Sequence, residues 1–363
     1  MESGGRHPQL YFLDGDVVLG ASLLRSLDGK VDQYQLYRVH KAYLGHNSVF
    51  FANLFADGSA GLGPKYDGQP LVEVLDEAEN FSRLLTYIYS PFGPLFKRWS
   101  PDAPMSLTPI IRLADKYLIE SLRTALIEQV TSDWPCTLAA WDASEGEANA
   151  IRDTYKRSVV SNSHATRFAD QIPEPASAIV FARELTCPDI LPAVFYQLCR
   201  IGIKEEFEHR ENYYPTRSGR LARWALLGRE DLTRYLHGCD ALETYCKELR
   251  RKFAEGDPVA EGCVPMWARP ELGPTREDEK DRTGWPCYAF TERILQLAWP
   301  EDGEREPLEG LLKLLEYERL PDVRNDHPRG FCEDCDWGFH GWLRAERQML
   351  WAQLPELFQL PRP

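Results

Sequence analysis

The sequence has 363 residues, a length that at ~100 to 200 residues per domain predicts two or three domains. Apolar residues make up 43% and aromatic residues 12% of the chain, which is enough to fill globular cores and excludes wholesale disorder. With 42 basic and 56 acidic side chains the formal net charge is −14. A general nucleic-acid or anionic-membrane surface is therefore not expected, because phosphate binding needs clustered cations.

The N-terminal residues lack a basic flank followed by an apolar stretch of signal-peptide length, and no later segment approaches the ~18 apolar residues of a membrane-spanning helix. We therefore expect an intracellular protein, cytoplasmic or nuclear, without membrane contact. Its nine cysteines are far sparser than in disulfide-stapled secreted domains, so most of them are expected to be reduced thiols.

The first third of the chain predicts a small sheet. Two short apolar runs, at residues 16–19 and 36–39, flank the turn sequence Asp28-Gly29-Lys30 and predict a hairpin. Alternating side-chain faces over residues 71–75 predict a third strand. Residues 1–8, which precede these strands, are expected to be disordered.

Helical patterns accompany the predicted strands. Residues 40–55 predict two short helices, the second capped by Asn47 or Ser48 through a side-chain acceptor. Asp76, followed by Glu79 three residues later, predicts the start of another helix through reciprocal capping. Two later helices are predicted at residues 106–117 and 119–130.

Everything after Pro135 predicts helices. Leu242, Cys246, Leu249 and Phe253 recur at helical spacing and are expected to form a core. Two segments, at residues 256–285 and 320–330, are expected to be loose. The change of pattern predicts two domains, an α+β domain at residues 9–132 and a helical C-terminal region at residues 133–363.

Several motifs of the first domain occur in a specific order. They are Asp16-Val17-Val18-Leu19, Tyr37-Arg38-Val39-His40-Lys41, Ser48-Val49-Phe50-Phe51-Ala52-Asn53-Leu54-Phe55, Leu84-Leu85-Thr86-Tyr87-Ile88-Tyr89 and Ala114-Asp115-Lys116-Tyr117-Leu118. This order resembles a BTB (POZ) domain, which implies a short three-stranded sheet flanked by about five helices. The layout, with a helical region ending in Leu350-Trp351-Ala352-Gln353-Leu354, further resembles a large fungal group of single-BTB proteins.

The resemblance implies a protein-interaction module without enzymatic activity or a required cofactor. BTB domains commonly form dimers, and family members act as transcriptional cofactors or as substrate adaptors of cullin-type ubiquitin ligases. Their helical cluster presents apolar surface to partners, so Phe51 and Phe55 are candidate partner-binding residues. A homodimer and a cullin are the candidate partners, whereas direct nucleic-acid binding is not expected of this acidic chain.

The resemblance also suggests a charged pocket. In the transcription-factor branch, an acidic residue at the strand start and a basic residue after the histidine line a pocket near the dimer seam, and Asp16 and Lys41 match these positions. Alternatively, Asp16 accepts backbone hydrogen bonds at the hairpin and Lys41 is solvated. His40, also a candidate partner-binding residue, ends a strand and is expected to cap the helix that follows.

Two departures from the family pattern bear on the partners. Only about ten residues precede the first predicted strand, too few for the extra N-terminal helix that some BTB dimers exchange. The segment after Phe55 lacks a clear equivalent of the hydrophobic and acidic pair that cullin-binding members carry. A swapped dimer and a cullin adaptor are therefore less favoured than a simple interaction module.

The strongest chemical motif is a cysteine pair near the C-terminus. Cys332 and Cys335 are two residues apart, with His327 five residues before the pair and His340 five residues after it, and such a set can bind one Zn²⁺ tetrahedrally. If a histidine does not bind, a distant cysteine could complete the shell: Cys263 or Cys287. Because a lone C-x2-C is half a site, thiols that bind no metal are favoured over structural zinc.

The sequence carries no motif of a known catalytic or phosphate-binding site. It has no G-x-S-x-G elbow, no H-E-x-x-H and no G-x-x-x-x-G-K-[ST] loop. An enzyme or zinc-dependent protein that uses the C-terminal Cys/His cluster is kept only as an alternative to the interaction module.

Overall fold

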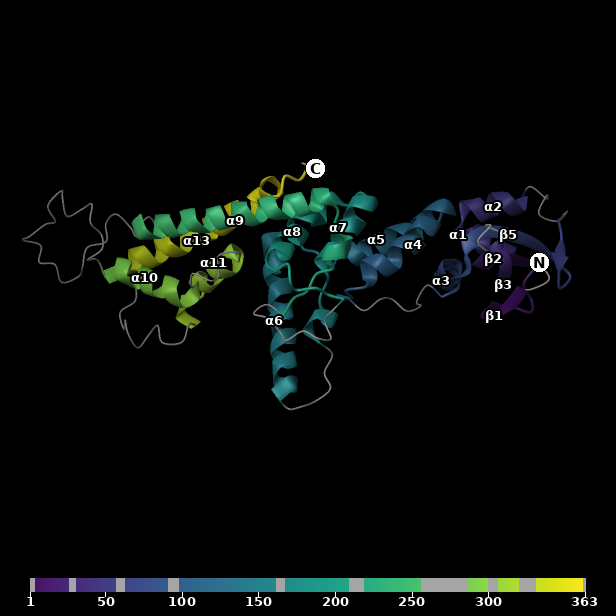
Figure 1. Ribbon diagram of the computed structural model, residues 1–363, viewed down its shortest axis with the longest axis horizontal. Coiled ribbons are helices and arrows are strands. Elements are labelled where there is room, and N and C mark those ends of the chain that lie inside the picture. The colour runs from purple at the N-terminus through teal and green to yellow at the C-terminus, as the bar shows by residue number, and fades with distance from the viewer. Residues whose placement is uncertain are drawn as a thin grey trace, which may run out of the picture. The chain divides into compact units, whose positions relative to one another are not determined.

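The computed structural model describes residues 4–25, 31–56, 63–90, 98–160, 167–208, 219–255, 286–299, 306–319 and 331–361. The chain divides into two compact units (Figure 1). The N-terminal unit comprises Met1–Asp133 and Asp170–Phe181, and the helical unit comprises Trp134–Ala169 and Ala182–Pro363. The α+β fold class is confirmed, since a small sheet in the first unit is followed by many helices.

The sheet of the N-terminal unit has five strands in the described residues, against the three expected. The strand order is β1-β3-β2-β5-β4. Strands β2 and β3 are antiparallel, as the predicted hairpin requires, and β5 lies parallel to β2 on its other side. The turn at Asp28-Gly29-Lys30 lies outside the described residues. The strands are β1 (Gly4–Tyr11), β2 (Val17–Arg25), β3 (Val31–Val39), β4 (Lys65–Tyr66) and β5 (Gln69–Glu77).

Residues 4–8 were expected to be disordered, and this prediction is wrong because they form the first part of β1. The strand pairs in parallel with β3 and forms an edge of the sheet. Leu10 is its one buried side chain, so the sequence shows no apolar alternation there. The strand is held instead by main-chain pairing and by contacts such as the His7 ring against Tyr37, with ring centroids 5.4 Å apart.

Five helices follow the strands of this unit: α1 (Lys41–Asn47), α2 (Val49–Ala56), α3 (Ala78–Tyr89), α4 (Ala103–Lys116) and α5 (Glu120–Thr131). Ser48 caps α2 as predicted, since its Oγ accepts a hydrogen bond from the Phe51 amide at 3.1 Å. The predicted capping by Asp76 is wrong, because α3 begins two residues later. Asp76 instead accepts hydrogen bonds from Lys116 Nζ at 2.6 Å and from the Tyr117 hydroxyl.

The helical unit contains three long helices among the described residues, α6 (Leu138–Val160), α9 (Arg229–Glu255) and α13 (Glu333–Leu357), and the shorter helices α8 (Leu191–Cys199), α10 (Pro286–Ala298) and α11 (Pro307–Leu315). Helix α7 (Pro175–Glu184) contributes residues to both units. The predicted stripe of α9 is buried, including Leu242, Cys246 and Phe253. It packs against α10, α11 and α13 in one hydrophobic core.

The C-terminal end of α13 has a regular apolar stripe. Leu350, Leu354 and Phe358 recur every four residues and are fully buried, so this face of α13 is part of the core. The Phe358 ring stacks on Phe195 with a centroid separation of 5.6 Å. Gly238 of α9 lies directly against the Phe358 ring, where a β-carbon would overlap it.

The two segments expected to be loose, residues 256–285 and 320–330, lie outside the described residues. Among the helices that the structure describes, none combines the length and the apolar character needed to cross a bilayer.

Candidate functional site

The structure gives Asp16 a capping role. Its Oδ1 accepts a hydrogen bond from the backbone amide of Lys41, the first residue of α1, at 2.7 Å. Asp16 thus accepts a backbone hydrogen bond, as the structural alternative expected, but at the start of α1 and not at the hairpin. Lys41 is half-buried, and a partner-facing role for its ammonium group stays a prediction.

His40 is the N-cap residue of α1, as predicted, but its side chain makes no capping hydrogen bond. Its ring is held elsewhere: Nε2 lies 3.3 Å from an Asp14 carboxylate oxygen, and Nδ1 lies 3.2 Å from the Tyr89 hydroxyl. The Phe12 and Tyr43 rings both contact Tyr89, each with a centroid separation of 4.9 Å. Burial raises the pKa of Tyr89 to about 12, so its hydroxyl stays protonated at neutral pH.

The phenylalanines of α2 differ in exposure. Phe51 is fully buried, with its ring stacked on Tyr117 at a centroid separation of 5.0 Å. Phe55 is half-buried and stacks on Phe51 at 5.8 Å. The most exposed aromatic side chain of α2 is Phe50, which is 38% exposed. Of these two neighbours, Phe50 and not Phe51 is therefore accessible at the surface.

Phe50 lies where the start of α2 meets the end of α4. The Ser48 hydroxyl donates to the Tyr117 carbonyl at 2.5 Å, which ties the start of α2 to the end of α4. The Phe50 ring stands edge-on against Tyr117 at 5.2 Å. Val49 and Leu118, the chain neighbours of these contacts, are 58% and 53% exposed. We call Val49, Phe50 and Leu118 the α2–α4 patch.

Leu118 has an unusual backbone conformation. Its φ is +51°, in the left-handed region that favours glycine or asparagine. The Leu118 amide donates to the Asp115 carbonyl at 3.0 Å and the Ile119 amide to the Ala114 carbonyl at 2.8 Å, the two bonds of a Schellman helix end. The apolar contact of such an end is made by the residue after the left-handed one, here the buried Ile119. The Leu118 side chain is not needed for the helix end.

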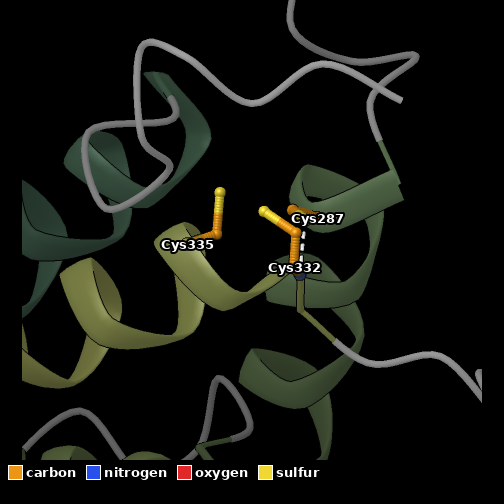
Figure 2. Close-up of side chains that lie close together, drawn as sticks. All are labelled: Cys287, Cys332 and Cys335. Carbon is orange, nitrogen blue, oxygen red and sulfur yellow. Dashed lines mark hydrogen bonds between the residues drawn. The ribbon is translucent and has the colours of Figure 1, made fainter. Parts of the chain in front are cut away.

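Three cysteine side chains converge in the helical unit (Figure 2). Cys332 is the N-cap residue of α13, Cys335 lies in the first turn of that helix, and Cys287 lies in the first turn of α10. Their sulfur atoms all lie within 4.8 Å of one another. The Cys332 amide also donates to Cys287 Sγ at 3.3 Å. Cys287 was predicted only as a distant alternative to a histidine.

The two histidines proposed with this pair have different outcomes. His340 turns toward main-chain carbonyls: Nδ1 lies 2.9 Å from the Asp336 oxygen and Nε2 lies 3.2 Å from the Leu315 oxygen. Its ring thus holds the end of α11 close to α13 and is not placed with the thiols. His327 and Cys263 lie outside the described residues.

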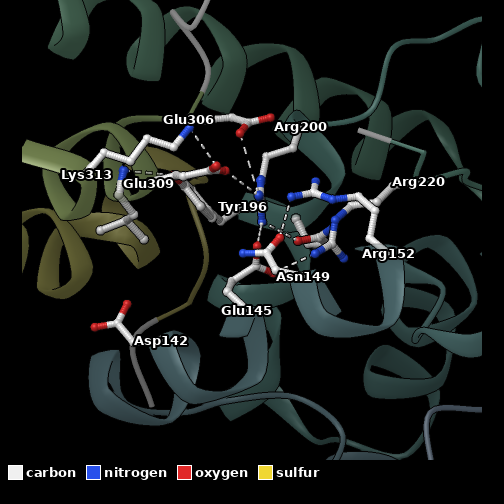
Figure 3. Close-up of polar contacts among 12 residues, drawn as sticks. Asp142, Glu145, Asn149, Arg152, Tyr196, Arg200, Arg220, Glu306, Glu309 and Lys313 are labelled. Atoms are coloured by element: carbon white, nitrogen blue, oxygen red, sulfur yellow. Dashed lines mark hydrogen bonds and ion pairs between the residues drawn. The ribbon is translucent and has the colours of Figure 1, made fainter. Parts of the chain in front are cut away.

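The helical unit also contains an ion network that was not predicted from the sequence (Figure 3). Arg200 at the end of α8 and Arg220 have side chains only 4% and 5% exposed. The Glu145 carboxylate of α6 accepts from both guanidinium groups, at 2.8 Å from Arg200 and 2.7 Å from Arg220. Arg200 also lies 3.1 Å from Glu309 of α11. The network therefore ties α6, α8 and α11 together.

The charges of this network shift one another's pKa values. Burial alone would raise the pKa of Glu145, but the positive charges of Arg200 and Arg220 outweigh it and the pKa is lowered. Burial and a hydrogen bond to Glu309 raise the pKa of Glu306, whereas that hydrogen bond and Arg200 lower the pKa of Glu309 despite its burial. The carboxyl of Glu306 is thus the one that holds a proton more readily.

A second bridge has the geometry of a two-point ion pair. The Arg347 guanidinium of α13 donates to both carboxylate oxygens of Asp142, at 2.9 and 2.5 Å. Like the Glu145 network, it joins helices that lie far apart in sequence. Nothing in the sequence distinguishes the charged residues of these two bridges from solvated surface charges, because their burial follows from how the helices pack.

Comparison with known protein families gives one finding. Residues 30–133 match the BTB/POZ domain, and this range covers most of the N-terminal unit, from β3 to the end of α5. Strands β1 and β2 precede the matched range but belong to the same sheet. A search of curated proteins finds no match to the chain. The chain is therefore a BTB/POZ domain-containing protein.

Proposed function

We propose that the chain is a non-enzymatic protein-protein interaction protein, and that its BTB domain binds a second copy of the chain through the α2–α4 patch. The matched domain is an interaction module. The observation that carries the proposal is Leu118, a large apolar side chain that is half exposed on a strained backbone position.

The energetics of Leu118 favour a role outside the isolated domain. A left-handed conformation costs a residue with a β-carbon ~1–2 kcal/mol, a cost that glycine avoids and that asparagine lessens. The exposed side chain recovers little of this cost within the monomer. Burial against a partner would contribute ~1.5–3 kcal/mol for a leucine side chain, which exceeds the backbone cost over most of that range.

Self-association suits the composition of the patch. Val49, Phe50 and Leu118 carry no charge, so the same surface on two copies meets without unpaired ions. The chains as a whole repel each other, since each has a formal charge of −14. Added salt screens such repulsion. A homodimer should therefore tighten as salt rises, whereas a complex with a basic protein should weaken.

The test compares two substitutions of exposed apolar residues by asparagine in the full chain. Asparagine readily adopts the left-handed backbone conformation, so Leu118→Asn keeps the helix end and removes apolar surface from both sides of a symmetric dimer. Ile203→Asn is the matched control, since Ile203 is 66% exposed in the helical unit. Sedimentation velocity between 50 and 500 mM salt gives the dimer dissociation constant, and thermal unfolding gives the stability.

We expect the wild-type chain to dimerise more tightly at high salt. Leu118→Asn should weaken the dimer at least tenfold, because each ~1.4 kcal/mol of lost burial is a factor of ten, while the melting temperature is unchanged or higher. Ile203→Asn should leave the dimer unchanged. A wild-type chain that stays monomeric at 100 μM, or a Leu118→Asn dimer as tight as wild type, contradicts the proposal. A monomer that co-purifies with a cullin would support the adaptor hypothesis in its place.

A further inference from the structure

We propose that Cys287, Cys332 and Cys335 bind one zinc ion, which joins the N-terminal ends of α10 and α13. Cys287 lies 45 residues before Cys332 in the chain, so no local sequence motif contains all three ligands. The site lies in the helical unit, outside the BTB domain, and does not depend on the proposed dimer.

The distances between the sulfur atoms suit a tetrahedral ion. With Zn–S bonds of ~2.3 Å, tetrahedral geometry separates two sulfur ligands by ~3.8 Å. The three sulfur atoms already lie within 4.8 Å of one another. Side-chain rotations that move each sulfur by about 1 Å or less bring them to the tetrahedral separation. Figure 2 shows Cys332 and Cys335 at the start of one helix, facing Cys287 on the other.

All three sulfur ligands lie at the N-terminal ends of helices. Cys332 and Cys335 lie at the N-terminal end of α13, and Cys287 lies in the first turn of α10. The partial positive charge of a helix N-terminus favours negative charge placed beside it. The Cys332 amide, 3.3 Å from Cys287 Sγ, adds a hydrogen bond to that sulfur. Such outer contacts orient and support metal ligands.

The surroundings favour a bound cation over scattered core thiols. Cys287 and Cys335 are buried, and they form a cluster of their own with Tyr288, beside the half-buried Phe331. Glu333, Asp334 and Asp336 of the first turn of α13 add negative charge close by. Sulfur ligands select zinc over magnesium or calcium, which prefer oxygen. The ion would hold α10 against α13 at the edge of the helical core.

The proposal changes the ligand set expected from the sequence. Cys287 takes the place of His340, whose two ring nitrogens face the carbonyls of Asp336 and Leu315. Among the described residues the group has three members. A tetrahedral ion has a fourth position, and X-ray absorption on the zinc-loaded chain identifies whether sulfur, nitrogen or oxygen occupies it.

The experiment measures metal in the full chain, purified without chelators from zinc-supplemented cells. We expect one zinc per chain by mass spectrometry of the metal content, and less than a tenth of that in Cys287→Ser and Cys335→Ser. Cys136→Ser is the matched control, because Cys136 is exposed and distant in sequence from the three cysteines. It should keep one zinc. Removal of zinc from the wild-type chain should lower its melting temperature.

A second measurement keeps the test decisive if a serine variant fails to fold. Co²⁺ titrated into the reduced wild-type chain should saturate at one ion, with the intense near-ultraviolet absorption of cobalt–thiolate bonds and the visible bands of tetrahedral cobalt. The proposal is overturned by a wild-type chain that holds no stoichiometric zinc and shows no thiolate absorption with Co²⁺. It is equally overturned by full zinc content in folded Cys287→Ser and Cys335→Ser, or by a disulfide between two of these residues.

Discussion

Because Gly238 packs against the Phe358 ring, Gly238→Ala should destabilise the protein, whereas a glycine-to-alanine substitution in a helix usually stabilises it. Alanine is more favourable than glycine inside an exposed helix by ~1 kcal/mol. At Gly238 of α9, however, an added β-carbon would lie on Cδ1 and Cε1 of the Phe358 ring, far inside the ~3.5–4.0 Å at which carbon atoms pack. The ring would have to move by more than about 1 Å.

The ring has little freedom to move. Phe358 is fully buried and stacks on Phe195. Overpacking a core costs ~1–3 kcal/mol, and this overlap is deep enough to reach the upper end of that range. After the helix-propensity gain, Gly238→Ala should destabilise the helical unit by about 2 kcal/mol. Gly341→Ala on α13, where a β-carbon meets nothing within 4 Å, should stabilise it by ~0.5–1 kcal/mol.

Urea unfolding of the full chain, followed by circular dichroism, measures both variants. Phe358→Ala alone should cost ~3–5 kcal/mol, but clearly less in the Gly238→Ala background, where the smaller side chain relieves the overlap. This double-mutant cycle reports the contact itself. If Gly238→Ala stabilises the chain as Gly341→Ala does, or if the two substitutions are additive, the packing argument for the end of α13 fails.

Two further predictions concern buried charges. Burial raises the pKa of Asp133 to about 6, so the folded state binds a proton that the unfolded state releases above pH ~4. The contribution of this carboxyl to the free energy of unfolding is therefore present below pH ~4 and is lost as pH rises through 6. Asp133→Asn should therefore stabilise the N-terminal unit at pH 8 by on the order of 1–2 kcal/mol and make its stability depend less on pH between pH 4 and 7. Urea unfolding of both proteins at these pH values measures the difference, and equal stability at pH 8 argues against the prediction. Glu145→Gln leaves the charges of Arg200 and Arg220 without their shared carboxylate and should lower the free energy of unfolding by ~3–5 kcal/mol. The control Asp153→Asn, on the exposed face of α6, should leave it unchanged. If Glu145→Gln also leaves it unchanged in the same unfolding assay, the structural role of the network is contradicted.

Much of the fold could be predicted from local patterns. The hairpin strands, the Ser48 cap and the apolar stripe of α9 depend on residues close in sequence, and the structure contains each of them. Strand β1 and the residue Asp76 are exceptions. Strand β1 has a single buried side chain and exists because β3 offers it an edge. Asp76 looks like a helix cap, but its carboxylate is taken by Lys116 and Tyr117, forty residues away.

The candidate sites were predictable only in part. The Cys332 and Cys335 pair follows from its spacing, since residues three apart at a helix start face the same way. That Cys287, and not His340, lies beside this pair is set by the contact of α10 with α13. Similarly, a phenylalanine-rich helix is evident at residues 49–56, but only its packing against Tyr117 decides that Phe51 is buried and Phe50 exposed.

The sequence by itself therefore determined the fold class and the cysteine pair, because turn chemistry, periodicity and short spacing encode them, and its ordered motifs carried the resemblance to a BTB domain. Tertiary structure decided which charges are buried, which aromatic side chains reach solvent and which third cysteine joins the pair. The physical reason is that burial and distance depend on how separate helices pack, and a helix of given periodicity can present its faces to several different neighbours.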